Sequence, residues 1–335
     1  MCCANRRSVL GVFGVALVAL GLGFAGCTPA PDPWTNAKQG QKHVLVTFPP
    51  LYCLTHAIAG DDAYVLCFLT TEEPHDYKLN PQDAIKARRA DLIIYNSLTL
   101  DDTFVEKLIV GKKIATLSAK EAIPKDKILA NKDEDDDKKD AKHDHKKDGH
   151  HHHGGNDPHV WLSPERAMDI ADAIGKKLAD IDPSHADGYK KRSAALRADL
   201  QKLWDDGKSL LKGKENKKIV SMHDSMRYFA QAFDIDVIAV IEELPGQDPD
   251  AKKLADLVKR CKEKDVRVIT YEPQYTKAQP ELLQKQLKNR GIDIQLIEFD
   301  PIETAPLGKD GVNPDPDYYL KKMRANLEAL AKALP

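Results

Sequence analysis

Length, composition and charge exclude some classes of function before any motif is considered. The chain has 335 residues, enough for about two domains. Its 50 Lys and Arg nearly balance 52 Asp and Glu, and the formal net charge of −2 gives no general attraction to nucleic acid. Nucleic-acid binding is therefore not expected, and the 30% of charged residues, of both signs, is typical of a soluble body.

The amino terminus has the order of a bacterial export signal. The basic pair Arg6-Arg7 is followed by an uncharged run over 9–26 and then by Cys27. This order predicts a cleaved signal peptide over 1–26. A permanent anchor helix is the alternative, because the run is close to membrane-spanning length.

The residues around the predicted cut resemble a lipobox. Small residues at Ala25-Gly26 precede Cys27, although Phe24 stands where leucine is usual. In a lipobox the cysteine is lipidated, so Cys27 would hold the protein on a membrane surface without a spanning helix. The residues over 27–42, rich in proline, alanine and polar side chains, then predict a flexible tether.

Three cysteines remain in the predicted mature body. They are Cys53, Cys67 and Cys261, and an odd number implies no disulfide framework. A bond between Cys53 and Cys67 and two buried free thiols are both compatible with the sequence.

Between residues 43 and 117, apolar runs typical of strands alternate with amphipathic runs typical of helices. Strands are predicted over 43–48, 64–69, 91–95 and 113–117, and helices over 51–59, 81–90 and 102–110. The strand runs are continuously apolar, which indicates burial on both faces. A mostly parallel sheet covered by helices is therefore expected.

One segment lacks any side chain able to support a core. Residues 132–153 contain eight acidic residues, six Lys and six His, and are predicted to form a disordered loop. The six histidines are His143, His145, His150, His151, His152 and His153. They could gather metal weakly as a mobile trap, or the loop could be a solvated spacer.

A long helix is predicted over 183–213, between two halves of the chain. The segment has no internal proline after Pro183 and places apolar residues at helical spacings, although Gly207 and Gly213 weaken its end. A continuous helix of this length would extend about 45 Å, at about 1.5 Å per residue. Such a helix would link two domains stiffly.

The alternation of strands and helices restarts after residue 215. Strands are predicted over 217–221, 237–241, 266–271 and 292–299, and helices over 225–233, 249–264, 278–289 and 318–334. The fold class is therefore α/β, with two similar lobes of mostly parallel sheet. The amino-terminal lobe is expected over 43–182 and the carboxy-terminal lobe over 214–335.

Three histidines lie in polar, turn-rich segments beside predicted elements. His75 follows the second strand, His159 precedes a helix that Ser163 would cap, and His223 follows the strand over 217–221. Loops at the carboxyl ends of parallel strands are where ligands gather. With Asp300 at the end of the last strand, three imidazoles and a carboxylate would make a site suited to Zn²⁺, with Mn²⁺ as an alternative. Taken alone, the residues are equally compatible with three unrelated loop histidines.

These motifs, in this order, resemble one family. They are similar to motifs of the zinc- and manganese-binding solute-binding proteins of bacterial ABC importers. The segments that carry the resemblance are Pro74-His75-Asp76-Tyr77, Asp157 to Pro164, His223-Asp224, Glu272-Pro273-Gln274 and Asp300-Pro301. The resemblance covers the chain from residue 43 to 335 and is most specific around His159.

The resemblance implies a fold, a ligand set and a partner. Members of the family have two α/β lobes joined by a long rigid helix, bind one ion in the cleft between the lobes and deliver it to a membrane permease. His75, His159, His223 and Asp300 would be the ligands. Glu272 would orient a histidine or replace Asp300 as a ligand. Zinc-handling members often carry a charged, His-rich loop, which here is 132–153.

We therefore expect an exported, lipid-anchored and monomeric Zn²⁺ receptor rather than an enzyme, facing the periplasm or the cell exterior. A manganese receptor is the nearest alternative, and three imidazoles favour zinc over manganese. A metal-dependent hydrolase would need a metal-bound water and a general base, for which Glu272 is the nominal candidate. A surface adhesin is a further alternative, but adhesion alone gives no reason for converging imidazoles.

Overall fold

The computed structural model describes residues 32–75, 77–131, 155–242 and 248–335. Residues 32–335 form one compact unit. Within the described ranges, no helix combines the length and the apolar character needed to span a bilayer.

The first sheet follows the order β2-β1-β3-β4, and all its neighbouring strands are parallel. Its strands are β1 (Lys42–Val46), β2 (Ala63–Cys67), β3 (Leu92–Tyr95) and β4 (Ala115–Ser118). The helices of this half of the chain are α1 (Pro49–Ala59), α2 (Asp83–Arg88), α3 (Asp102–Ile109) and α4 (Ala119–Ala122), with a 3-10 turn η1 (Lys125–Lys127).

The second sheet repeats this arrangement, with the order β6-β5-β7-β8 and parallel pairing throughout. Its strands are β5 (Lys218–Ser221), β6 (Asp236–Val240), β7 (Val268–Tyr271) and β8 (Gln295–Glu298), and its helices are α7 (Arg227–Phe233), α8 (Ala251–Lys264) and α9 (Ala278–Lys288). Two four-stranded parallel sheets with covering helices confirm the predicted α/β class.

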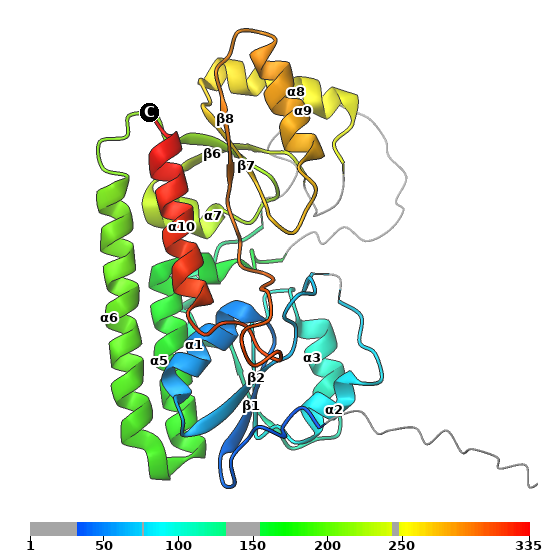
Figure 1. Ribbon diagram of the computed structural model, residues 1–335, viewed down its shortest axis with the longest axis vertical. Helices are drawn as coiled ribbons and strands as arrows, with labels where there is room; N and C mark the ends of the chain where they lie inside the picture. The colour runs from blue at the N-terminus through cyan, green and yellow to red at the C-terminus, as the bar shows by residue number, and fades with distance from the viewer. Residues whose placement is uncertain (1–31, 76, 132–154, 243–247) are drawn as a thin grey trace, which may run out of the picture. The chain divides into compact units, whose positions relative to one another are not determined.

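Long helices connect and support the two sheets (Figure 1). They are α5 (Pro164–Ile181), preceded by the 3-10 turn η3 (Val160–Leu162), α6 (Ala186–Leu210), preceded by η4 (Pro183–His185), and α10 (Tyr318–Ala333). The predicted linking helix over 183–213 thus corresponds to η4 and α6, which ends three residues earlier than expected.

Alternate residues along each central strand point into different apolar clusters, as the period of two in a strand requires. In β1, Val44 and Val46 pack into the cluster that contains residues of α1, α5, α6 and α10, whereas Leu45 packs against α2 and α3. In β5, Ile219 joins the first of these clusters and Val220 packs with α8 and α9. Both faces of each sheet are therefore buried, and one cluster is shared by the two sheets.

The described part of the segment predicted as a tether, residues 32–42, is packed against the body, which corrects the expectation for these residues; residues 27–31 of that segment lie outside the described ranges. Trp34 is 2% exposed, stacks on the ring of His43 and donates from Nε1 to the carbonyl of Lys86 at 3.0 Å. Asp32 pairs with Arg89. An indole buries a large apolar surface, and this contact fixes the chain nine residues before the predicted strand over 43–48.

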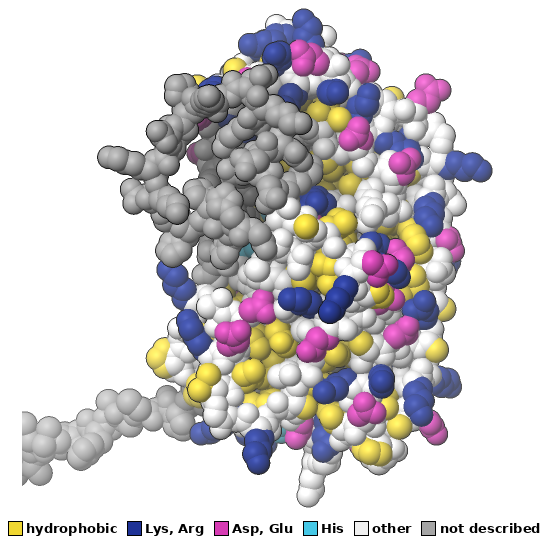
Figure 2. Space-filling model, turned by 180° about the vertical axis from the view of Figure 1, so that it is seen from behind, with side chains coloured by type: hydrophobic (Ala, Val, Ile, Leu, Met, Phe, Trp, Pro, Cys, Tyr) yellow, Lys and Arg dark blue, Asp and Glu magenta, His cyan; other side chains and the backbone are white. Residues whose placement is uncertain are grey.

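Two other features of the body bear on the predictions. Cys53, Cys67 and Cys261 are buried free thiols, so the structure contains no bond between the first two. On the face shown in Figure 2, Lys and Arg side chains are interspersed with Asp and Glu over the described surface, as the near-zero net charge led us to expect.

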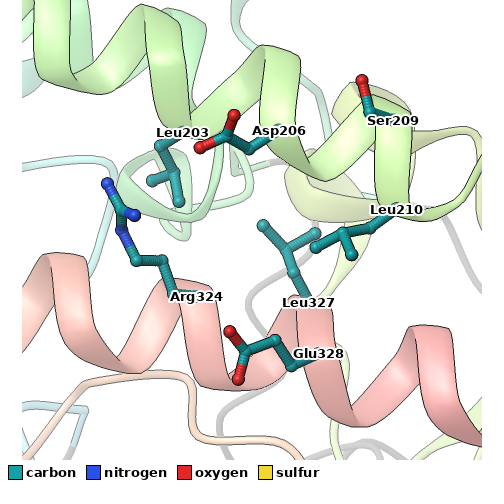
Figure 3. Close-up of a pocket in the computed structure, with 7 residues that line it drawn as sticks. All are labelled: Leu203, Asp206, Ser209, Leu210, Arg324, Leu327 and Glu328. Carbon is teal, nitrogen blue, oxygen red and sulfur yellow. The ribbon is translucent and has the colours of Figure 1, made fainter.

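A cavity of about 430 Å³ lies between α6 and α10. Figure 3 shows its lining residues, Leu203, Asp206, Ser209 and Leu210 of α6 and Arg324, Leu327 and Glu328 of α10. None of the predicted site residues lines it.

Candidate metal centre

His159 lies in the short connection that leads into η3 and α5. Ser163 and Pro164 occupy the N-cap and first helical positions of α5, as predicted, although the Ser163 hydroxyl makes no capping hydrogen bond. Asp157 Oδ1 accepts from the backbone N–H of His159 at 3.0 Å and contacts Nδ1 of its ring at 2.9 Å. Because a carboxylate only accepts, this contact places the proton on Nδ1 and turns the lone pair of Nε2 toward the site.

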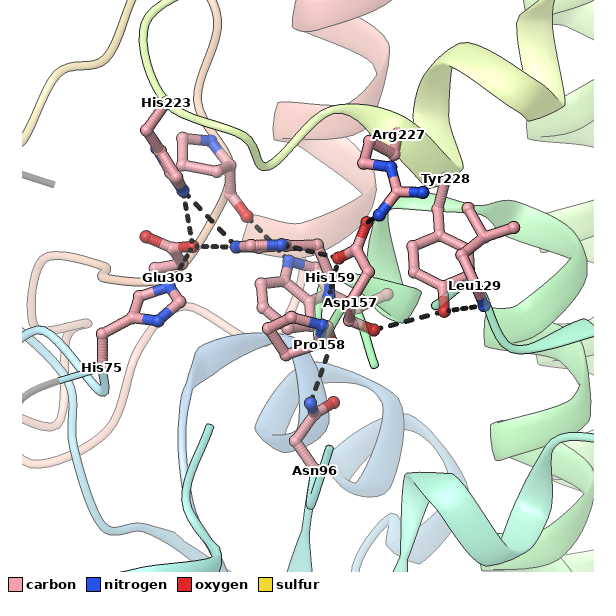
Figure 4. A network of polar contacts seen from close by, with 12 residues as sticks. His75, Asn96, Leu129, Asp157, Pro158, His159, His223, Arg227, Tyr228 and Glu303 are labelled. Atoms are coloured by element: carbon pink, nitrogen blue, oxygen red, sulfur yellow. Dashed lines mark hydrogen bonds and ion pairs between the residues drawn. The ribbon is translucent and has the colours of Figure 1, made fainter. Parts of the chain in front are cut away.

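Further contacts hold the segment that carries His159 (Figure 4). The Tyr228 hydroxyl donates to the carbonyl of Asp157 at 3.2 Å, and the Asn96 amide donates to the carbonyl of Pro158 at 2.9 Å. Arg227 lies 3.7 Å from Asp157 Oδ2. Backbone, carboxylate and ring are therefore fixed together.

His223 follows β5 and is held in a similar way. Its Nδ1 lies 2.6 Å from Glu272 Oε1, and the other oxygen of Glu272 accepts from the Gln274 amide at 3.0 Å. Glu272 follows β7, the neighbour of β5 in the sheet, so adjacent strand ends supply the histidine and its partner. Glu272 thus holds a histidine, which is the first of the two roles predicted for it.

His75 reaches the same point from the segment after β2, in the first sheet. Its Nε2 lies 3.3 Å from Glu303 Oε1, and its ring centroid lies 5.3 Å from that of His159 and 6.0 Å from that of His223. Its side chain is 23% exposed, against 5% for His159 and 3% for His223. The three predicted histidines therefore come together, with His75 on the open side.

The carboxylate that faces them is Glu303, which sequence reasoning did not select. The backbone of Ile302 adopts a φ of 65°, and Trp161 Nε1 donates to the carbonyl of Pro301 at 2.7 Å. This turn after β8 directs the Glu303 side chain, which is 0% exposed, into the cluster.

Asp300 points elsewhere, which corrects its prediction as the fourth member of the cluster. Its side chain accepts from the backbone of Ile302 at 2.8 Å and from the Tyr318 hydroxyl at 3.0 Å, and it pairs with Lys322 at 3.0 Å. Asp300 therefore ties the end of β8 to α10. Asp300 and Glu303 are both carboxylates that follow β8, so the sequence does not distinguish them as candidate ligands. The turn at Ile302 makes their side chains point in different directions.

Four of the six distances among the ligand atoms of the cluster are close to those around a four-coordinate ion. His75, His159, His223 and Glu303 each offer a ligand atom, and these atoms lie within 4.8 Å of one another. The Nε2 atoms of His159 and His223 are 3.4 Å apart, and they lie 3.1 and 3.5 Å from Glu303 Oε1. A tetrahedron with bonds of about 2.0–2.1 Å, as zinc forms with imidazole, has edges of about 3.3–3.4 Å.

The electrostatics of the cluster also call for a cation. If only Nδ1 were protonated in His159 and His223, their Nε2 atoms and Glu303 would present only lone pairs to one another. Burial would lower the pKa of His159, but its contacts with Asp157 and Glu303 outweigh burial and raise the pKa to about 9. Burial is likewise outweighed at His223, where Glu272 and Glu303 raise the pKa well above its usual value. Protons therefore balance the charge when no metal is bound.

A second carboxyl group lies beside the cluster. Burial, followed by the negative charge of Glu303, raises the pKa of Glu73 to about 8. Glu73 Oε2 accepts from the Tyr275 hydroxyl at 2.8 Å, and the Tyr275 ring lies edge-on to the ring of His223, with centroids 6.4 Å apart.

Sequence reasoning did not single out Glu303, Asp157, Glu73 or Tyr275, which lie in or beside the cluster. Asp157 stands two residues before His159 in the segment from Asp157 to Pro164. Because metal-binding imidazoles usually donate their second ring N–H to a carboxylate, this position could have predicted Asp157 as the partner of His159. No local pattern marks Glu73 or Tyr275. Cys27 and the loop histidines over 143–153 lie outside the described residues.

Comparisons with known proteins identify the family of the chain. The family model described as zinc-uptake complex component A, periplasmic (ZnuA), matches residues 44–333. The high-affinity zinc uptake system protein ZnuA of Bacillus subtilis is 30% identical over 329 residues, covering 97% of each chain. The zinc-binding protein AdcA of Streptococcus pyogenes is 29% identical over 310 residues, which are 88% of this chain but only 57% of that protein.

Solved structures show the same fold. Zn(II)-bound AdcA of Streptococcus pneumoniae has a TM-score of 0.67 at 26% identity, covering 88% of this chain and 58% of that one. A crystal structure of ZnuA has a TM-score of 0.69 at 22% identity, covering 88% of this chain and 99% of that one. Since the family model matches most of its length and a relative is 30% identical along nearly all of it, the chain belongs to the ZnuA family of periplasmic zinc-uptake components.

Proposed function

We propose that this chain captures Zn²⁺ outside the cytoplasmic membrane and delivers it to the permease of an ABC importer. His75, His159, His223 and Glu303 are the proposed ligands. The observation that carries the proposal is a set of four contacts of 3.1–3.5 Å among Nε2 atoms and one carboxylate oxygen, close to the edge of a zinc tetrahedron, with all four ligand atoms within 4.8 Å of one another. Family membership and relatives named as zinc-binding proteins support the same assignment.

Zinc is favoured over manganese by the donor set. Three imidazoles and one carboxylate suit a four-coordinate borderline-soft ion, whereas Mn²⁺ prefers more oxygen ligands and stands low in the Irving–Williams order. A competition experiment with limiting amounts of both metals should therefore load zinc in preference to manganese.

The site is proposed to bind and release its ion, without catalysis. Four protein ligands fill a tetrahedral zinc ion and leave no position for an activated water, which hydrolysis requires. Glu272, the nominal general base, is bonded to His223 and Gln274 and acts here as a support of the site.

We further propose that the protein is exported, lipidated at Cys27 and monomeric. A relative from Streptococcus pneumoniae, 30% identical over 304 residues, is named a zinc-binding lipoprotein, which supports the lipid anchor. The weak zinc-gathering role of the loop over 132–153 stays a prediction, and its deletion should leave one tightly bound ion per chain.

Elemental analysis tests the proposed function. Wild-type protein purified without added metal should contain about one zinc per chain, and the His159→Ala variant should contain far less after the same dialysis. Wild-type protein that holds no zinc, or that prefers manganese in the competition experiment, would refute the proposal.

A further inference from the structure

Glu73 and Tyr275 join the two sheets beside the candidate metal centre. Glu73 belongs to the segment between β2 and α2 and stands two residues before His75, whereas Tyr275 lies in the turn after β7, three residues beyond Glu272. The Tyr275 hydroxyl donates to Glu73 Oε2 at 2.8 Å. This bond ties the segment of the most exposed proposed ligand to the segment that holds His223.

We infer that Glu73 and Tyr275 are a positioning pair whose hydrogen bond keeps the His75 segment closed over the ion and thereby limits the rates of zinc entry and release. The inference rests on the proposed function and names residues that control it without binding the metal.

The surroundings of Glu73 show why this one bond matters. Its second oxygen, Oε1, is buried and has no hydrogen-bond partner among the described residues. Without the Tyr275 hydroxyl, both oxygens would be unsatisfied, and a buried unsatisfied carboxyl group is costly enough to favour movement toward water.

Movement of Glu73 would be transmitted to His75. The intervening residue, Pro74, is buried and has a fixed φ, so the short segment has little freedom to absorb a displacement. His159 and His223 have separate carboxylate partners and would stay in place. Opening at this bond would therefore uncover the ion from the His75 side.

Stopped-flow measurements on the full-length chain test the pair. Zinc release is followed after mixing the loaded protein with excess chelator, and zinc entry after mixing metal-free protein with zinc. In Tyr275→Phe, which keeps the ring against His223, both rates should rise about fivefold, the factor that one net hydrogen bond contributes. Because entry and release change together, Kd should change less than about twofold.

Companion variants separate positioning from general damage. Glu73→Ala should match Tyr275→Phe, and the double variant should add nothing further, as expected for two residues that share one bond. Glu73→Gln keeps an acceptor oxygen and should restore rates close to wild type. Tyr189 of α6 donates a comparable hydrogen bond to Asp182 at 2.8 Å. Tyr189→Phe removes this bond and should leave the rates of zinc entry and release unchanged.

Unchanged rates in Tyr275→Phe would overturn the inference. A faster release matched by weaker affinity, with an unchanged entry rate, would also overturn it, because the pair would then support the bound ligand rather than gate it. Both outcomes require wild-type protein that binds zinc, so they differ from failure of the proposed function itself.

Discussion

The segments that carry His159 and His75 differ in how firmly they are held. His159 is 5% exposed in its side chain, and Asp157, Asn96 and Tyr228 fix its ring and backbone. His75 is 23% exposed, and its only described polar side-chain contact is with Glu303. One proposed ligand is thus built into the interior, while the other reaches the site from its surface.

This difference suggests how one site can hold an ion tightly and still release it. His159, His223 and Glu303 are the three buried members of the proposed ligand set, and as each is aimed by neighbouring groups they would form a pre-organised base for the ion. His75 completes the tetrahedron from the open side. Tight binding then depends mainly on the buried base, and the rate of exchange depends on the exposed member.

The largest expected effect comes from removing the buried ligand. His159→Ala should weaken zinc binding by more than about 100-fold, because loss of a partner that only orients a ligand already costs about 10- to 100-fold. Titration against a competing chelator measures the loss. His185→Ala is the matched control, because His185 also bonds a carboxylate, Asp182 at 2.7 Å, but lies on η4. An affinity in His159→Ala within tenfold of wild type would remove this residue from the site.

Removal of the exposed ligand should cost less. His75→Ala leaves the three-ligand base intact, and a water can take the fourth position, so we expect a loss of about 100-fold with one ion still bound per chain. The same chelator titration applies. If His75→Ala weakened binding more than His159→Ala, the distinction between a buried base and an exposed member would be wrong.

Loss of the partner that orients His159 should have a smaller effect. Asp157→Asn keeps the shape of the side chain but weakens the contact to Nδ1, and affinity should fall by about 10- to 100-fold. Asp182→Asn, at the corresponding contact of His185, should leave zinc affinity unchanged. Equal affinities for Asp157→Asn and wild type would show that the ring needs no such support.

The smallest effect per step is that of pH. The pKa of His159 is raised to about 9, whereas an ordinary imidazole has a pKa of about 6.5. Between about pH 6.5 and pH 9 the ring therefore still holds a proton that zinc must displace. Affinity should therefore rise with pH throughout this window, by about tenfold per pH unit for each displaced proton. Calorimetry at pH 7 in buffers of different ionisation enthalpy should detect proton release. Binding without proton release would contradict the raised pKa.

Much of the fold follows from local sequence patterns. Continuously apolar runs such as Leu92–Tyr95 predicted parallel strands, and both faces of the sheets are indeed buried. His75, His159 and His223 each stand beside a regular element in a polar turn, and the resemblance of their motifs to a metal-binding family predicted that they converge. The packing of Trp34 was not, since a single indole among polar residues does not indicate which surface it will cover.

The fourth member of the site depended on a feature that sequence patterns do not carry. Asp300 and Glu303 are both carboxylates just after β8, and the positive φ of Ile302 decides which one faces the imidazoles. Tyr275, near His75 through Glu73, and Arg227, near His159 through Asp157, come from segments far along the chain from these histidines. Their roles follow from tertiary contacts alone.

The most direct test of the account compares these two carboxylates. Glu303→Gln and Asp300→Asn make the same change, from carboxylate to amide, at positions three residues apart. Zinc content after dialysis against a chelator should fall to near zero in Glu303→Gln and stay near one ion per chain in Asp300→Asn. The reverse result, or equal retention of zinc by both variants, would contradict the assignment of Glu303 to the metal centre.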